Sequence, residues 1–148
     1  MKTDKKLVIA GGTSDTDEFV NEIKMLAKDD ERIIFTGFVQ GTILGELYSN
    51  AYIYTLPSDL EGMPLSLLEA MSYGNCCLVS NIAECVEVVE DKAEIFKKSD
   101  INDLRDKLQQ LCDNKTVVEK YKSEASDYIC DKYNWDVVVE KTLKEYGV

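Results

Sequence analysis

Histidine is missing from this chain of 148 residues. Without it the chain cannot build a Ser-His-Asp or Cys-His catalytic unit, and catalytic zinc sites are disfavoured because most of them use histidine ligands. We therefore expect no metal site. Proline occurs only twice, and we find no Gly/Ser-rich linker, internal repeat or low-complexity tract. The sequence thus predicts a single domain over residues 1–148.

Basic residues are also scarce, and none occurs from residue 33 to residue 91. The formal net charge of −11 repels phosphate backbones and anionic bilayers at long range, so we expect no nucleic-acid binding. Long apolar runs are missing too: the longest have the length of a strand, and the apolar run at residues 7–10 is too short for a signal peptide. We expect a cytoplasmic protein, in which only parts outside this chain would associate with a membrane.

Five cysteines are present, an odd number whose spacing matches no zinc pattern. Cys76 and Cys77 begin an apolar run that is typical of a buried strand. We interpret all five as free thiols in a reducing compartment.

Short apolar runs alternate with helical patterns along the chain. The apolar runs predict strands at residues 7–11, 32–36, 51–56, 76–80 and 94–96. The helical patterns cover residues 16–28, 42–49, 64–73, 84–89, 101–112, 116–131 and 136–146. This alternation indicates an α/β fold, a Rossmann-like doubly wound parallel sheet in a three-layer α/β/α arrangement.

Ligands of such sheets bind beyond the carboxyl ends of the strands, so four loops are candidates. They cover residues 11–15, 37–41, 57–64 and 80–83. Gly11 and Gly12 allow a ligand close to the backbone, although a plain tight turn explains them equally. Phe38 and Val39 place an aromatic ring and free backbone in the second loop, unless Phe38 is simply a core residue.

The third loop, PSDLEGMP, runs directly into a helix. We expect free backbone amides around Met63, Leu65 and Ser66, which would make this helix start a site for an anion. Glu61 and Glu69 would flank these donors. Because the neighbours of Glu69 are apolar, we expect its carboxylate to be partly buried and to need hydrogen-bond donors. A ligand with phosphate in the middle and hydroxyls at both ends fits this arrangement.

The segment EGMPLSLLEAM, preceded by Pro57-Ser58 and followed by Gly74, resembles the donor-binding signature of the group 1, or family 4, GT-B glycosyltransferases. That signature has two glutamates separated by seven residues and then Ala-Met and glycine. Other segments are similar to the same family: FTGF at 35–38, LGELYSNA at 44–51, SNIAECVEVVED at 80–91 and NWDVVVEKTLKEY at 134–146. The resemblance covers nearly the whole chain.

The resemblance implies a retaining, hexosyltransferase-type enzyme of glycan or glycolipid biosynthesis that uses a UDP-, GDP- or ADP-sugar and no cofactor. It implies that Glu61, the catalytic candidate, contacts the donor sugar and that Glu69 binds the ribose hydroxyls. Ser66 would donate to phosphate, and Phe38 and Val39 would flank the base. The remaining donor-binding candidates are Gly11, Gly12, Gly62, Met63, Pro64 and Leu65.

The family's enzymes have an N-terminal domain that this chain does not contain, and the chain opens at what resembles the second strand of the C-terminal domain. We therefore expect the chain alone to be inactive and its phosphate-neutralising cation to come from elsewhere. Without the first strand–helix unit, the strands at residues 7–11 and 51–56 would have open edges. These edges would pair with each other or promote self-association.

Two alternatives stay open. The chain could be a non-catalytic nucleotide-sugar-binding subunit that depends on a partner. It could also be a flavodoxin-like or response-regulator-like domain, which needs a phosphoacceptor aspartate at the end of a strand. Asp59 follows a strand but is not at its first loop position, and the paired glutamates would have no explanation.

Overall fold

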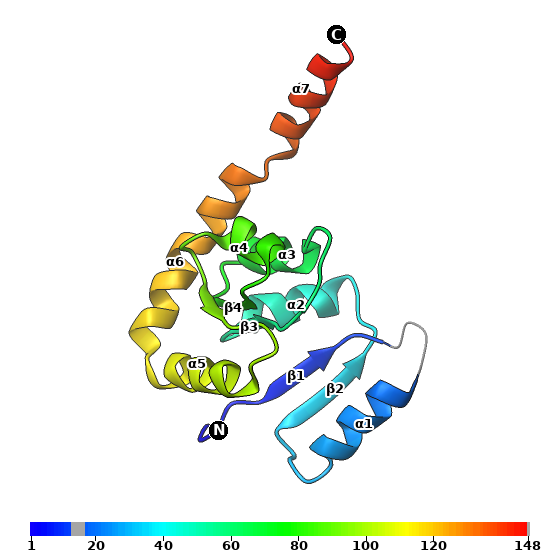
Figure 1. Ribbon diagram of the computed structural model, residues 1–148, viewed down its shortest axis with the longest axis vertical. Helices are drawn as coiled ribbons and strands as arrows, with labels where there is room; N and C mark the ends of the chain where they lie inside the picture. The colour runs from blue at the N-terminus through cyan, green and yellow to red at the C-terminus, as the bar shows by residue number, and fades with distance from the viewer. Residues whose placement is uncertain (13–16, 148) are drawn as a thin grey trace. The chain divides into compact units, whose positions relative to one another are not determined.

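A computed structural model describes residues 1–12 and 17–147, and these residues form two compact units, Met1–Leu47 and Tyr48–Val148. Five parallel strands and seven helices alternate as predicted (Figure 1). The predicted α/β fold class is therefore confirmed. Residues 13–15 of the first candidate loop, and the predicted helix start at residue 16, lie outside the described residues.

The first unit contains a two-stranded parallel sheet of β1 (Leu7–Ala10) and β2 (Ile33–Gly37), joined through α1 (Asp17–Ala27). Leu7 lies opposite Ile33, and the register shifts between Ile9 and Ala10. Ala27 is the single apolar residue of this unit that is buried among those described. This unit therefore contributes little to a hydrophobic core.

The second unit has the core. Its sheet has the order β3-β4-β5, from Tyr54–Leu56, Cys77–Ser80 and Glu94–Phe96. All four residues of the central strand β4 are buried, which explains its uninterrupted apolar sequence. Helices α3 (Leu65–Ser72), α4 (Ala83–Val89), α5 (Ile101–Asp113) and α6 (Lys115–Lys132) pack around this sheet, α4 against β4 and α5 against β5.

Strand β3 is shorter than the predicted strand at residues 51–56. The preceding helix α2 (Thr42–Asn50) ends in a turn in which the Ala51 amide donates to the Tyr48 carbonyl, at 3.3 Å. Ladder pairing starts only where the Tyr54 amide donates to the Cys76 carbonyl, at 2.8 Å. The buried Asn75 side chain fixes this junction, because its amide donates to the carbonyls of Tyr48 and Ala70, at 3.0 and 2.9 Å.

The strands of each unit form a parallel sheet of their own. In these sheets β1 pairs with β2, and β3 pairs with β4. The expected direct pairing of the strands at residues 7–11 and 51–56 would join the two units, and it stays a prediction.

The last helix, α7 (Trp135–Glu145), has no buried residue, and Trp135 is 79% exposed. Asn134 caps its start through a hydrogen bond from the Asp136 amide, at 2.8 Å. Across residues 1–12 and 17–147, none of the helices combines the length and the apolar character that crossing a bilayer would require.

Candidate functional site

Glu61 is held in the loop that follows β3. The Ser58 hydroxyl donates to Glu61 Oε1 at 2.6 Å, and the Ser80 hydroxyl donates to the backbone carbonyl of Ser58. Ser80 ends the buried strand β4. The loop is thus tied to the centre of the sheet, and the Glu61 carboxylate has a fixed hydrogen-bond donor.

The start of α3 supplies free amide donors, although not the three that the sequence predicts. The Leu65 amide already donates to the Met63 carbonyl at 2.8 Å, so it is not free. The amides of Gly62, Met63 and Ser66 donate to no described residue, and Pro64 caps the helix without a side-chain hydrogen bond. Three neighbouring amides are therefore available to an anion at this helix start.

Glu69 lies one turn further along α3. It is exposed, so the prediction of a partly buried carboxylate is wrong, because the apolar residues around it in the sequence face other sides of the helix. It nevertheless has the expected hydrogen-bond donor, since the Tyr48 hydroxyl lies 3.1 Å from Glu69 Oε2.

The Ser66 hydroxyl, between the two glutamates in sequence, also has a tyrosine partner. Tyr54 donates to Ser66 Oγ at 2.8 Å. Burial raises the pKa of Tyr54 to about 12, so this tyrosine stays protonated and remains a donor at neutral pH. In the second unit, Ser58, Tyr48 and Tyr54 therefore each supply a hydroxyl to one candidate site residue.

The candidates of the first unit form a separate group. The Gly11 amide donates to the Gly37 carbonyl at 2.9 Å, and a β-carbon at Gly12 would lie 3.7 Å from that of Phe38. Phe38 is 76% exposed, which excludes the interpretation of its ring as a core residue within the described structure. Val39 is half-buried. The predicted site residues are thus gathered in two groups, one in each unit.

The loop after β5 is not among the four candidate loops that the sequence predicts. Ser99 has a left-handed backbone, with φ of 58°, and its hydroxyl donates to both carboxylate oxygens of Asp59, at 3.0 and 3.1 Å. The Lys98 amide donates to Asn81 Oδ1 at 2.7 Å, while its exposed ammonium group pairs with no described carboxylate. The rule that ligands bind at the carboxyl ends of strands could have identified this loop.

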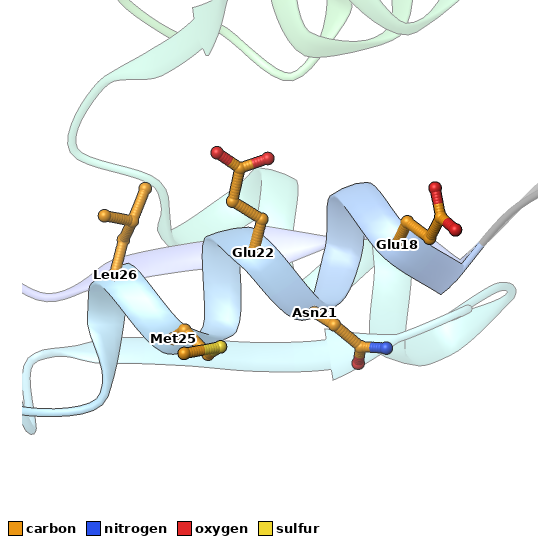
Figure 2. A pocket seen from close by; sticks show the side chains of 5 residues that line it. All are labelled: Glu18, Asn21, Glu22, Met25 and Leu26. Atoms are coloured by element: carbon orange, nitrogen blue, oxygen red, sulfur yellow. The ribbon is translucent and has the colours of Figure 1, made fainter.

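A shallow depression on α1 does not form a ligand site. The five side chains that line it all project from this one helix: Glu18, Asn21, Glu22, Met25 and Leu26 (Figure 2). No second element encloses them, and Met25 and Leu26 are 70% and 82% exposed. The described residues also contain no group of three or more carboxylates or thiols that could hold a metal ion.

Comparisons with known proteins identify the family of the chain. The profile of the family described as Glycosyl transferases group 1 matches residues 1–141. Among relatives, "Uncharacterized glycosyltransferase MJ1607" of Methanocaldococcus jannaschii is 25% identical over 97% of this chain and 37% of its own length. The N,N'-diacetylbacillosaminyl-diphospho-undecaprenol alpha-1,3-N-acetylgalactosaminyltransferase of Campylobacter jejuni is 33% identical over 68% of this chain and 27% of its own.

Solved structures show the same fold. Sucrose-phosphate synthase of Thermosynechococcus elongatus superposes with a TM-score of 0.84 and 19% identity over 95% of this chain and 37% of that one. Anabaena HepE, in complex with UDP and glucose, superposes with a TM-score of 0.87 and 13% identity over 96% and 40%. The chain thus spans well under half the length of these relatives and of these two solved structures. Because the family profile covers almost the whole sequence, this chain belongs to the group 1 glycosyltransferase family.

Proposed function

We propose that this chain carries the part of a retaining glycosyltransferase that binds the nucleotide-sugar donor, a UDP-, GDP- or ADP-sugar. The observation that carries the proposal is the start of α3, where free amide and hydroxyl donors lie in the sequence between two carboxylates that are each held by a dedicated hydroxyl. Amides favour phosphate, and carboxylates accept hydrogen bonds from sugar hydroxyls.

The diphosphate, the ribose and the transferred sugar would then each have a partner in the second unit. The amides of Gly62, Met63 and Ser66 would hold the diphosphate, with Pro64 and Leu65 lining it. Glu69 would accept hydrogen bonds from the ribose hydroxyls, and Glu61 would contact the transferred sugar as the catalytic candidate. The candidates of the first unit, which are Phe38 with its exposed ring, Val39, Gly11 and Gly12, stay predicted contacts of a base.

The names of relatives support a hexosyl donor without selecting one. They include a serotype-specific mannosyltransferase of Escherichia coli and the N-acetylgalactosaminyltransferase of Campylobacter jejuni. Because the chain spans 37% or less of these relatives, we propose that transfer itself requires the rest of such an enzyme. We propose that the transfer reaction uses no cofactor.

Binding measurements test the proposal. We would titrate the chain with UDP, UDP-glucose, GDP-mannose and ADP-glucose, following heat or ligand-observed NMR. Glu69→Ala should weaken binding of the preferred nucleotide by roughly tenfold or more, since hydrogen bonds to a charged group contribute about 1.5–3 kcal/mol each. Glu140→Ala, in the fully exposed helix α7, is the matched control. Binding of none of the four ligands would contradict the proposal for this chain.

The two glutamates should act on different parts of the ligand. Glu61→Ala should weaken binding of the nucleotide sugar several-fold and leave the affinity for the nucleoside diphosphate unchanged, because only the nucleotide sugar contains the transferred sugar. Glu69→Ala should weaken both. If Glu61→Ala weakened both ligands equally, the role of Glu61 at the sugar would be wrong.

A further inference from the structure

Tyr48 is held in place both by ring packing and by a hydrogen bond to its backbone. Its side chain is 8% exposed, and its ring stacks on Tyr73 with centroids 5.4 Å apart and lies 6.0 Å from the ring of Tyr54. Its backbone carbonyl accepts a hydrogen bond from the buried amide of Asn75. The ring therefore has one well-defined orientation, and its hydroxyl points at α3.

The hydroxyl of Tyr48 has one proton and two acceptors within reach. Glu69 Oε2 lies at 3.1 Å and the Ser66 carbonyl at 3.4 Å. The carboxylate is both closer and charged, so it takes the proton. Burial raises the pKa of Tyr48, with further contributions from Tyr54 and Glu69, so the hydroxyl remains a neutral donor.

Tyr54 determines the direction of a second proton. Because its hydroxyl donates to Ser66 Oγ at 2.8 Å, the Ser66 oxygen acts as an acceptor on that side. The proton of Ser66 must then point elsewhere, and no described residue accepts it. A hydroxyl that accepts one hydrogen bond becomes a better donor of the next, which suits a phosphate oxygen near the free Ser66 amide.

We propose that Tyr48 and Tyr54 are positioning residues of the nucleotide-sugar site, a role that rests on the proposed function. Tyr48 holds the exposed Glu69 carboxylate in one orientation, and Tyr54 directs the Ser66 proton toward the ligand. An exposed glutamate without such a donor samples several rotamers and loses this freedom on binding. The tyrosines therefore raise affinity without contacting the ligand.

Replacing Tyr48 or Tyr54 with phenylalanine removes the hydroxyl and keeps the aromatic ring. Tyr48→Phe should weaken nucleoside diphosphate binding about three- to tenfold, and Tyr54→Phe about three-fold, since each loses one hydrogen bond that organises the site. Tyr128→Phe is the matched control: it also loses a partly buried tyrosine hydroxyl, which donates to the Val88 carbonyl at 2.9 Å. The control should bind like the parent even if its melting temperature falls.

A double-mutant cycle separates positioning from packing. If Tyr48 acts through Glu69, Tyr48→Phe should change the affinity little once Glu69→Gln is present. A merely structural role would give the same loss in both backgrounds, which would overturn the proposal. The NMR resonance of the Glu69 side-chain carboxyl carbon gives a readout without ligand. It should shift in Tyr48→Phe and not in Tyr128→Phe; an unchanged resonance would also overturn the proposal.

Failure of this inference differs from failure of the proposed function. A parent chain that binds none of the nucleotides rejects the proposed function and the positioning role with it. A parent chain that binds, with Tyr48→Phe and Tyr54→Phe binding equally well, rejects the positioning role alone. Weaker binding by both variants, with the non-additive cycle and the shifted Glu69 resonance, supports it.

Discussion

All five cysteines belong to the second unit, and three of them are buried there, which suppresses their reactivity. Desolvation raises the pKa of the Cys76 thiol to about 12 and that of Cys85 to about 11, and it raises the pKa of Cys77 as well. Cys112 is half-buried and Cys130 is exposed. Since the thiolate is the nucleophile, these environments should separate the five thiols by rate.

Titration of the native chain with an aromatic disulfide reagent at pH 8 should therefore show Cys130 reacting first and Cys112 more slowly. Cys76, Cys77 and Cys85 should react only on unfolding in denaturant. The variant Cys130→Ser should lose the fast phase. Rapid reaction of more than two thiols in the folded chain would contradict the buried positions, and the total after denaturation should reach five.

Single residues also show which contacts the sequence could not predict. The spacing of Glu61 and Glu69 identified both as site candidates, and the structure gives each a hydrogen-bond donor. The donor of Glu69 is Tyr48, 21 residues earlier on another helix. Nothing in the local pattern predicts that contact, because periodicity reports which face of an element is apolar and not what faces it.

Secondary-structure elements were easier to predict than their pairing. Gly74 ends α3 with a left-handed backbone, φ of 71°, as the sequence indicates for a glycine that follows a helix. The strand predicted at residues 51–56 was too long, because its apolar first half belongs to a turn after α2. Apolar runs mark burial, whereas strand limits depend on ladder hydrogen bonds that a sequence does not display.

At the scale of a structural element, the role of the loop after β5 in ligand binding can be tested. From residue 33 to residue 91 the chain has no basic residue. The exposed ammonium group of Lys98, which pairs with none of the described carboxylates, therefore supplies positive charge that this segment lacks, at the carboxyl edge of the second sheet. We expect Lys98→Ala to weaken binding of a nucleoside diphosphate about two- to five-fold at low salt. Screening should shrink this difference at high salt.

Lys141→Ala, on the exposed helix α7, is the matched control because it removes the same charge far along the chain from the loop. It should leave the affinity unchanged at both salt concentrations. Equal losses from both lysine variants would show that only the overall charge matters, and the loop would then have no specific part in binding.

At the scale of the molecule, the sequence predicted the α/β fold class, and the described strands form a two-stranded parallel sheet in the first unit and a three-stranded one in the second. Each strand pairing depends on partners that are distant in sequence, so composition and periodicity could establish the fold class but not these pairings. Self-association through open strand edges stays a prediction, and light scattering over a range of concentrations would test it.

The division into two units predicts unequal stability along the chain. Among the described residues, Ala27 is the single buried apolar residue of the first unit, whereas the second contains a core around Cys76, Leu78 and Val118. Local opening is easiest where few apolar contacts oppose it. Amide hydrogen exchange should therefore be slowest in β4, where all residues are buried, and much faster in β1 and β2.

A core substitution makes this expectation specific. Leu78→Ala should cost about 2–5 kcal/mol and speed exchange throughout β3, β4 and β5, because it leaves a cavity under a fully buried strand. Leu7→Ala, at a strand residue that is 52% exposed, should cost much less and leave exchange in the second unit unchanged. If Leu7→Ala accelerated exchange in β4 as strongly as Leu78→Ala, the two units would unfold as one, and the expectation of separate stabilities would be wrong.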